Sequence, residues 1–311
     1  MDFKSIFLDR SNVLRSGWRF AVFFVAFFVF AVGFGGIAQT LLKAVNIPSG
    51  QGSMSSLVVN AVFSLIPAIL IGWLCGKLLE GLPFRALGAW FTQFWAKHLI
   101  LGLMMGTVTI GLAVLITAAF GGLRFTLNPD RASTAIWLTL GFSFIVFAIA
   151  AAFEEALFRG YILQTFNRSG LGWLAIILTS VFFGIVHIRN PSAGSISTLN
   201  TILAGVWFGV AYLKTRDLWF VWGMHLMWNW VQGAVFGIEV SGLTDITTAP
   251  LLKEIDKGPT WLTGENYGIE GGIACTIAII GSIAIIYFLP ILKPSEEMAT
   301  LTSPGNRIES N

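Results

Sequence analysis

The sequence predicts an all-α, polytopic membrane protein: a bundle of about eight transmembrane helices. Of its 311 residues, 55% are hydrophobic and only 11% are charged, and the mean hydropathy is +0.78. This composition is too apolar for a soluble domain. The apolar residues form unbroken runs of about 20 rather than alternating patterns, which indicates helices that cross the bilayer. The 12 Trp and 27 Phe residues suit a chain anchored at two membrane interfaces.

Eight apolar runs are candidate spans. The first follows a basic N-terminal segment and is too long for the apolar core of a secretory signal, so we expect a helix that is retained. Pro67 lies inside the second run and predicts a kink. The predicted spans are residues 19–42, 57–79, 98–120, 134–163, 171–187, 197–213, 218–237 and 270–289.

The chain reads as a single transmembrane domain over residues 1–293, followed by a polar cytoplasmic tail over 294–311. Twelve Lys and Arg residues of the loops and tails fall on the N-terminal side of the membrane and six on the other side. The positive-inside rule then predicts cytoplasmic termini, in the plasma membrane if the protein is prokaryotic. The acidic connection 238–269 is predicted to be external, and a passive linker is favoured over a lid.

Two carboxylates and an arginine interrupt the fourth predicted span. Glu154, Glu155 and Arg159 lie in the run FAIAAAFEEALFRGYIL. A charge near the middle of a bilayer costs about 2.5 to 3.5 kcal/mol on insertion scales, so it needs a partner or a function. Glu155 and Arg159 are four residues apart, in the order that favours a helical ion pair. Glu154 is turned by about 100° from Glu155, which leaves it free to act.

Two of the three histidines also lie in predicted spans. His187 closes the run SVFFGIVH, and His225 lies four residues before Asn229 in WGMHLMWNW, on the same helical face. Imidazole can move protons near neutral pH. His98, at the start of a span beside a lysine, is expected to be an interfacial residue without a catalytic role.

Each polar residue has a structural explanation when taken alone. An ion pair can support a helix, and an isolated His or Asn can hydrogen-bond neighbouring helices for about 0.6 kcal/mol on average. Ser and Thr would serve that purpose at lower cost. Two acids, two histidines and an amide on three spans therefore favour a catalytic site.

Three motifs in this order carry a family resemblance. EEALFR fits E-E-x-x-x-R, FGIVH fits F-x-x-x-H, and HLMWN fits H-x-x-x-N. On separate spans, they resemble the CAAX-processing and bacteriocin-processing (CPBP, or ABI) family of intramembrane proteases, which includes the Ras-converting prenyl endopeptidase. The resemblance covers mainly residues 150–232. It implies hydrolysis of a peptide bond in a membrane-associated or prenylated, CAAX-type substrate.

The resemblance also implies a role for each motif residue. Glu154 with His187 would activate a water molecule, and His225 with Asn229 would stabilise the oxyanion. Glu155 and Arg159, the remaining pair, would support the site. The residue types agree with these roles, because a carboxylate desolvated in lipid is a competent base and His and Asn donate hydrogen bonds to a developing oxyanion.

The role of a metal stays open at this stage. Similar proteins are often described as metalloproteases, and Glu154, His187 and His225 could provide three ligands for Zn²⁺ with an open position for water. The chain contains no H-E-x-x-H pair. We favour a mechanism without a metal or other cofactor, because zinc bound to Glu154 would remove the one unpaired base.

The expected enzyme has a water-filled cavity that opens to the cytoplasmic side. Its partners are the lipid bilayer and a peptide or membrane-protein substrate, and not nucleic acid. Two alternatives come from other classes of protein. A non-catalytic membrane scaffold or immunity protein would not need the intact motifs, and a transporter should show inverted repeats with broken helices, which the sequence does not.

Overall fold

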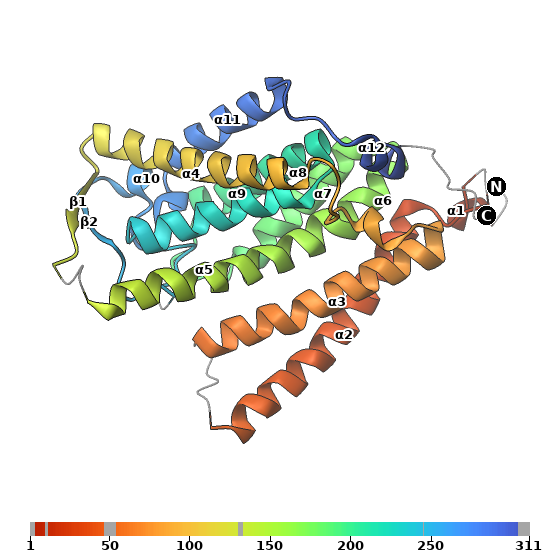
Figure 1. The fold of residues 1–311 in the computed structure, drawn as a ribbon, viewed down its shortest axis with the longest axis horizontal. Coiled ribbons are helices and arrows are strands. Elements are labelled where there is room, and N and C mark those ends of the chain that lie inside the picture. The colour runs from red at the N-terminus through yellow and green to blue at the C-terminus, as the bar shows by residue number, and fades with distance from the viewer. Residues whose placement is uncertain (1–3, 10–11, 47–53, 130–132, 245, 304–311) are drawn as a thin grey trace.

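The computed structural model describes residues 4–9, 12–46, 54–129, 133–244 and 246–303. These residues form a helical bundle, with a short two-stranded antiparallel ladder at one end (Figure 1). The ladder pairs β1 (Leu123–Leu127) with β2 (Leu252–Asp256), so that Leu123 lies opposite Asp256. The main helices are α2 (Ser16–Ala44), α3 (Met54–Glu80), α4 (Trp95–Ala119), α5 (Thr134–Glu155), α7 (Gly172–His187), α8 (Ser195–Thr215), α9 (Leu218–Trp230) and α11 (Ile273–Phe288).

Each predicted span coincides with one of these helices, which confirms the fold class. The helix that begins with α5 continues through the π-helical segment η2 (Ala156–Ile162) into α6 (Leu163–Arg168). Within the described residues, five helical segments are long and apolar enough to cross a membrane. The helices α7 and α11 are apolar but shorter, and α9 is extended by the π-helical segment η3 (Val231–Val235).

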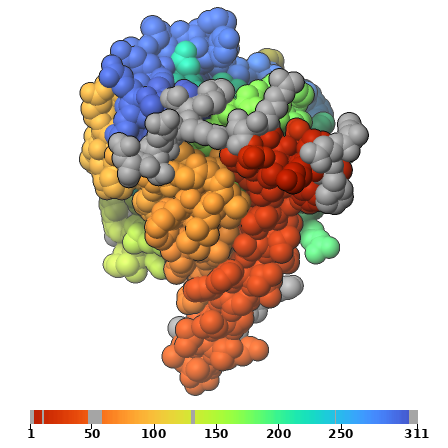
Figure 2. All heavy atoms as spheres, turned by 90° about the vertical axis from the view of Figure 1, so that its right-hand side faces the viewer, coloured from red at the N-terminus to blue at the C-terminus, as the bar shows by residue number. Residues whose placement is uncertain are grey.

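The α2–α3 hairpin lies at the edge of the bundle. Figure 1 shows it splayed away from α5, and Figure 2 shows α2, in red, projecting beyond the other helices. One face of α2 exposes large apolar side chains: Val25, Val29 and Val32 are each more than 60% exposed. An apolar face of this extent on a long helix is suited to lipid.

Close packing of α4 against α9 sets the position of the helix that carries His225. A Cβ atom on Gly102 would lie 2.1 Å from the carbonyl oxygen of Phe220, and one on Gly106 would lie 2.2 Å from that of Met224. Gly223 faces the α4 backbone in the same contact. Small residues let membrane helices approach this closely, so the glycines hold α9 against α4.

We predict that Gly106→Ala destabilises the protein by about 1–3 kcal/mol, the usual cost of forcing atoms into a packed contact. The added methyl group must push α9 away from α4. Thermal unfolding in detergent would measure the change. Gly111→Ala on the same helix is the matched control, because no atom lies within 4 Å of its Cβ position. Equal stability of the two variants would contradict the assigned packing.

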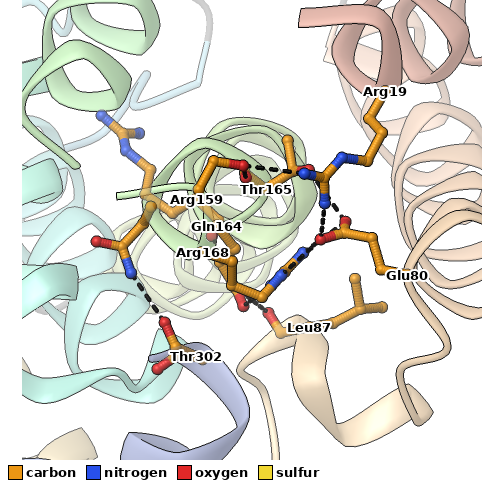
Figure 3. A network of polar contacts seen from close by, with 10 residues as sticks. Arg19, Glu80, Leu87, Arg159, Gln164, Thr165, Arg168 and Thr302 are labelled. Carbon is orange, nitrogen blue, oxygen red and sulfur yellow. Dashed lines mark hydrogen bonds and ion pairs between the residues drawn. The ribbon is translucent and has the colours of Figure 1, made fainter. Parts of the chain in front are cut away.

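A buried polar network ties the helices together at the end opposite the β ladder. Figure 3 shows Glu80 at the end of α3 between Arg19 of α2 and Arg168 of α6. Arg168 binds both carboxylate oxygens of Glu80 at 2.9 Å, and the Thr165 hydroxyl donates to one of them at 3.0 Å. Arg19 and Arg168 are among the basic residues that support the predicted topology, and they also belong to this network between helices.

The expected polar tail is partly folded onto the bundle. Helix α12 (Glu296–Thr302) buries Met298 and Leu301, and the carbonyl oxygen of Thr302 accepts a hydrogen bond from the Asn167 side chain at 2.9 Å. Residues 304–311 of that tail lie outside the described residues. The short helix α1 (Lys4–Phe7) and α12 lie at the same end of the bundle (Figure 1). This arrangement agrees with termini on one side of the membrane, and that side remains a prediction.

His98, expected at the membrane interface, has a structural role within the bundle that the sequence did not predict. Its side chain is buried, and its Nδ1 lies 2.8 Å from Asp217. Asp217 caps α9, accepting from the Trp219 backbone N–H at 2.9 Å. The sequence does not indicate this pairing, because the two residues are 119 positions apart. His98 therefore supports the start of α9.

Candidate active site

The motif residues converge on one cavity inside the bundle. Glu154, His187, His225 and Asn229 all line a space of about 270 Å³. Its walls come from α3, α5, α7, α8, α9 and α11, and most of them are apolar or aromatic. A largely apolar cavity with a few convergent polar groups is the usual form of a binding site.

Glu155 lies at the centre of a buried ion-pair network beside this cavity. Its Oε1 accepts from Arg159 at 2.9 Å and from Nδ1 of His225 at 2.8 Å. Arg159 also donates to the carbonyl oxygen of Gly205 at 3.1 Å and lies over the rings of Phe183 and Phe208. The predicted Glu155–Arg159 pair is present, and the geometry adds His225 to it. The pair therefore fixes the His225 ring.

Glu154 differs from its neighbour in having almost no protein partner. Its nearest ionic contact is His225 Nε2, at 3.8 Å from Oε2. That oxygen is buried, and no described residue forms a hydrogen bond with it. Buried carboxylate oxygens are normally paired, and an unpaired one at a cavity wall marks a place for water or a ligand. The sequence-based distinction between one held and one free glutamate matches this geometry.

Both cavity histidines use Nδ1 in a hydrogen bond within the protein and leave Nε2 free. His187 Nδ1 lies 2.6 Å from the carbonyl oxygen of Phe183, which can only accept, so Nδ1 carries the hydrogen. In a neutral ring, Nε2 of His187 is then an acceptor. His225 donates through Nδ1 to Glu155, and its ring stacks on Phe208 at 4.7 Å. Both rings are therefore held in fixed orientations.

Asn229 lies one helical turn beyond His225 on α9 and lines the same cavity. None of the described residues forms a hydrogen bond with its side chain, which leaves the amide free for a ligand. A π-helical segment begins directly after Glu155, and another begins after Trp230. Such segments are rare and are frequent at functional sites.

A family model for the Rce1-like group, described as type II CAAX prenyl endopeptidase Rce1-like, matches residues 135–231. The chain therefore carries an Rce1-like domain. The matched segment contains every motif residue named above, so it confirms the family suggested by the three motifs. The uncharacterized protein YyaK of Bacillus subtilis (strain 168) is 31% identical over 103 residues. That match covers 30% of this chain and 31% of YyaK, about a third of each. No solved structure matches the chain significantly.

A segment beyond residues 135–231, which was expected to be a passive linker, also contributes to the cavity. Val240, Ser241 and Leu243 line the cavity, together with Glu270. Glu270 accepts from Trp228 at 3.1 Å and from the backbone N–H of Ser241 at 2.6 Å. The linker interpretation is therefore wrong. The signal available in the sequence was the concentration of acidic and turn-forming residues in this connection.

Tyr267 helps to fasten the same segment. Burial, followed by the negative charge of Glu270, raises the pKa of Tyr267 to about 12. Its hydroxyl therefore stays protonated at neutral pH. The segment is bonded to α8, because the Asn200 side chain donates to the carbonyl oxygen of Glu270 at 2.8 Å.

The cavity reaches the connections near the β ladder, through Ser241 and Glu270. The helices α1 and α12 lie at the opposite end of the bundle (Figure 1). An opening on this side would therefore lie on the membrane face opposite the termini. The cytoplasmic opening of the cavity, like the side of the termini, stays a prediction.

The residues do not fit a three-ligand zinc site in this arrangement. Within the described part of the chain, no three His, Cys, Asp or Glu side chains are grouped as metal ligands. Nδ1 of His187 and Nδ1 of His225 are both used in hydrogen bonds, which leaves both Nε2 atoms free, and Glu154 lies 3.8 Å from Nε2 of His225. The three side chains nevertheless do not form such a group.

Proposed function

We propose that this protein is an intramembrane endopeptidase in which Glu154 activates a water molecule for attack on a peptide carbonyl. The supporting observation is the free carboxylate oxygen of Glu154, buried on a cavity that also receives His187, His225 and Asn229. These groups supply a base, a second proton acceptor and two oxyanion donors. Such a set can support general-base hydrolysis of a peptide bond.

The proposed reaction begins with water held between Glu154 and Nε2 of His187. Glu154 takes a proton as the water oxygen attacks the carbonyl carbon, which forms a tetrahedral oxyanion. The Asn229 amide and Nε2–H of His225 donate to that oxyanion. When the C–N bond breaks, Glu154 returns the proton to the leaving nitrogen, and the products are a carboxylic acid and an amine.

Glu155 and Arg159 are positioning residues in this scheme. His225 donates through Nδ1 to Glu155, so donation through Nε2 as well requires the doubly protonated ring. Two carboxylates beside the ring stabilise that positive charge. Arg159 holds Glu155 in place from the other side and balances its charge.

The substrate is a peptide or a membrane-associated protein, with a prenylated CAAX-type chain as the substrate class taken from the family. A second, almost wholly apolar cavity of about 320 Å³ lies between α3, α5 and α9 and includes Glu155 in its wall. The reacting bond would be held in the first cavity, within reach of Glu154.

The test is hydrolysis of a peptide library by the purified protein in detergent, with and without a chelator. We expect the wild type to cleave peptides, and the chelator to have no effect. His187→Ala and Asn229→Ala should each lower the cleavage rate at least a hundredfold, the usual effect of removing a proton-transfer group or an oxyanion donor. Loss of wild-type activity with chelator, restored by Zn²⁺, would overturn the metal-free step. Absence of cleavage in every folded variant and in the wild type would favour the membrane scaffold.

A further inference from the structure

The cavity has one carboxylate that the proposed reaction does not use. Among the described residues that line it, Glu154 and Glu270 carry carboxylates, and none is a lysine or an arginine. The reaction uses Glu154 beside the protonated His225, which leaves the charge of Glu270 unbalanced. Arg159 is directed to Glu155, and Arg189, close to His187 in sequence, is exposed to the surroundings. Cavity walls of low polarity strengthen the electrostatic field of a carboxylate, so this cavity attracts positive charge.

Glu270 is held firmly at the wall of this cavity. Its Oε1 accepts from the Trp228 indole at 3.1 Å, and its Oε2 accepts from the Ser241 backbone and hydroxyl at 2.6 and 2.9 Å. Each carboxylate oxygen has about two acceptor sites, so Oε1, which accepts one hydrogen bond, keeps capacity for a ligand. The carboxylate is thus preorganised without being neutralised by a protein cation.

The position of Glu270 relative to the reacting groups follows from helix α9. Glu270 is bonded to Trp228, the residue before Asn229 and three residues after His225. At about 1.5 Å per residue, Trp228 lies roughly one helical turn from His225 along the axis. An extended peptide advances about 3.3 Å per residue, so Glu270 lies within a few residues of the scissile bond.

We propose that Glu270 is a specificity-determining residue that binds a lysine or arginine side chain of the substrate, within three residues of the scissile bond. The inference rests on the proposed peptidase function and adds a substrate class to it. The cationic group would form a charge-assisted hydrogen bond with the carboxylate. The rings of Trp207 and Trp228, which also line the cavity, suit the same cation.

The test uses a peptide that the wild type cleaves, remade with lysine or uncharged norleucine at each position within three residues of the cut. We expect the wild type to prefer lysine at one position by about tenfold in kcat/KM, the effect of one charge-assisted hydrogen bond. Glu270→Gln should remove this preference. Glu270→Lys should reverse it in favour of a glutamate peptide.

The matched control is Glu265→Gln, which removes a carboxylate from the same connection. Glu265 is exposed and accepts a hydrogen bond from Thr260, away from the cavity lining. This variant should keep the lysine preference. The ratio between the two peptides is the readout, because a merely structural role for Glu270 would lower the cleavage of both equally.

The outcomes separate the two proposals. Equal cleavage of lysine and norleucine peptides by the wild type at every position would overturn the role of Glu270 and leave the peptidase intact. An unchanged lysine preference in Glu270→Gln would overturn it as well. Failure of the wild type to cleave any peptide would instead refute the proposed function on which the inference rests.

Discussion

Replacement of Glu154 by Gln is expected to reduce kcat by about a thousandfold or more, while the affinity for substrate peptide changes little. The amide is nearly the same size as the carboxylate but cannot take a proton from water. General-base catalysis alone contributes about 10²–10⁴-fold, and Glu154 also returns the proton to the leaving nitrogen. The measurement is kcat from peptide cleavage, with the dissociation constant from peptide binding to the same variant.

Glu239→Gln is a suitable comparison for that experiment. Glu239 is a carboxylate of the connection after α9, and its side chain is not part of the cavity lining. We expect near wild-type kcat for this variant. Comparable kcat values for Glu154→Gln and the wild type would remove Glu154 from the chemistry.

Replacement of Arg159 by Ala is expected to cost about 3–5 kcal/mol of stability, the usual effect of removing one partner of a buried ion pair. Arg159 is fully buried, and it pairs with Glu155, which also holds His225. The substitution leaves the Glu155 charge without its cation and removes a donor from the Gly205 carbonyl. Thermal unfolding in detergent and expression level are the measurements.

Two further variants make the Arg159 result specific. The double variant Glu155→Gln with Arg159→Ala should recover part of the lost stability, because no unpaired charge remains buried. Arg189→Ala, at an exposed arginine near His187, should change stability by less than about 0.5 kcal/mol. A loss in Arg189→Ala equal to that in Arg159→Ala would show that burial and pairing are not the cause.

Much of the fold was predictable because lipid imposes simple rules on sequence. A bilayer demands apolar runs of sufficient length, and each of the eight runs forms a helix near its predicted limits. The separation of Glu154 from Glu155 followed from helical geometry, and their different surroundings agree with it. The Glu155–Arg159 pair was predictable because its partners are four residues apart in one helix.

Contacts between distant segments could not be predicted. The pairing of His98 with Asp217, and of Glu80 with Arg19 and Arg168, depends on which helices are neighbours, and apolar runs do not encode this. The same applies to the connection that contains Ser241 and Glu270. Its composition indicated a loop, whereas its place at the cavity depends on bonds to α8 and α9.

The most direct measurement is mass spectrometry of peptides incubated with the purified wild type in lipid nanodiscs, beside an identical preparation of Glu154→Gln. The Glu154→Gln sample controls for a contaminating protease. We expect a complementary pair of fragments from one hydrolysed bond in the wild-type sample alone. The same fragments in both samples, or none in either while both proteins remain folded, would contradict the assignment of an active site at Glu154.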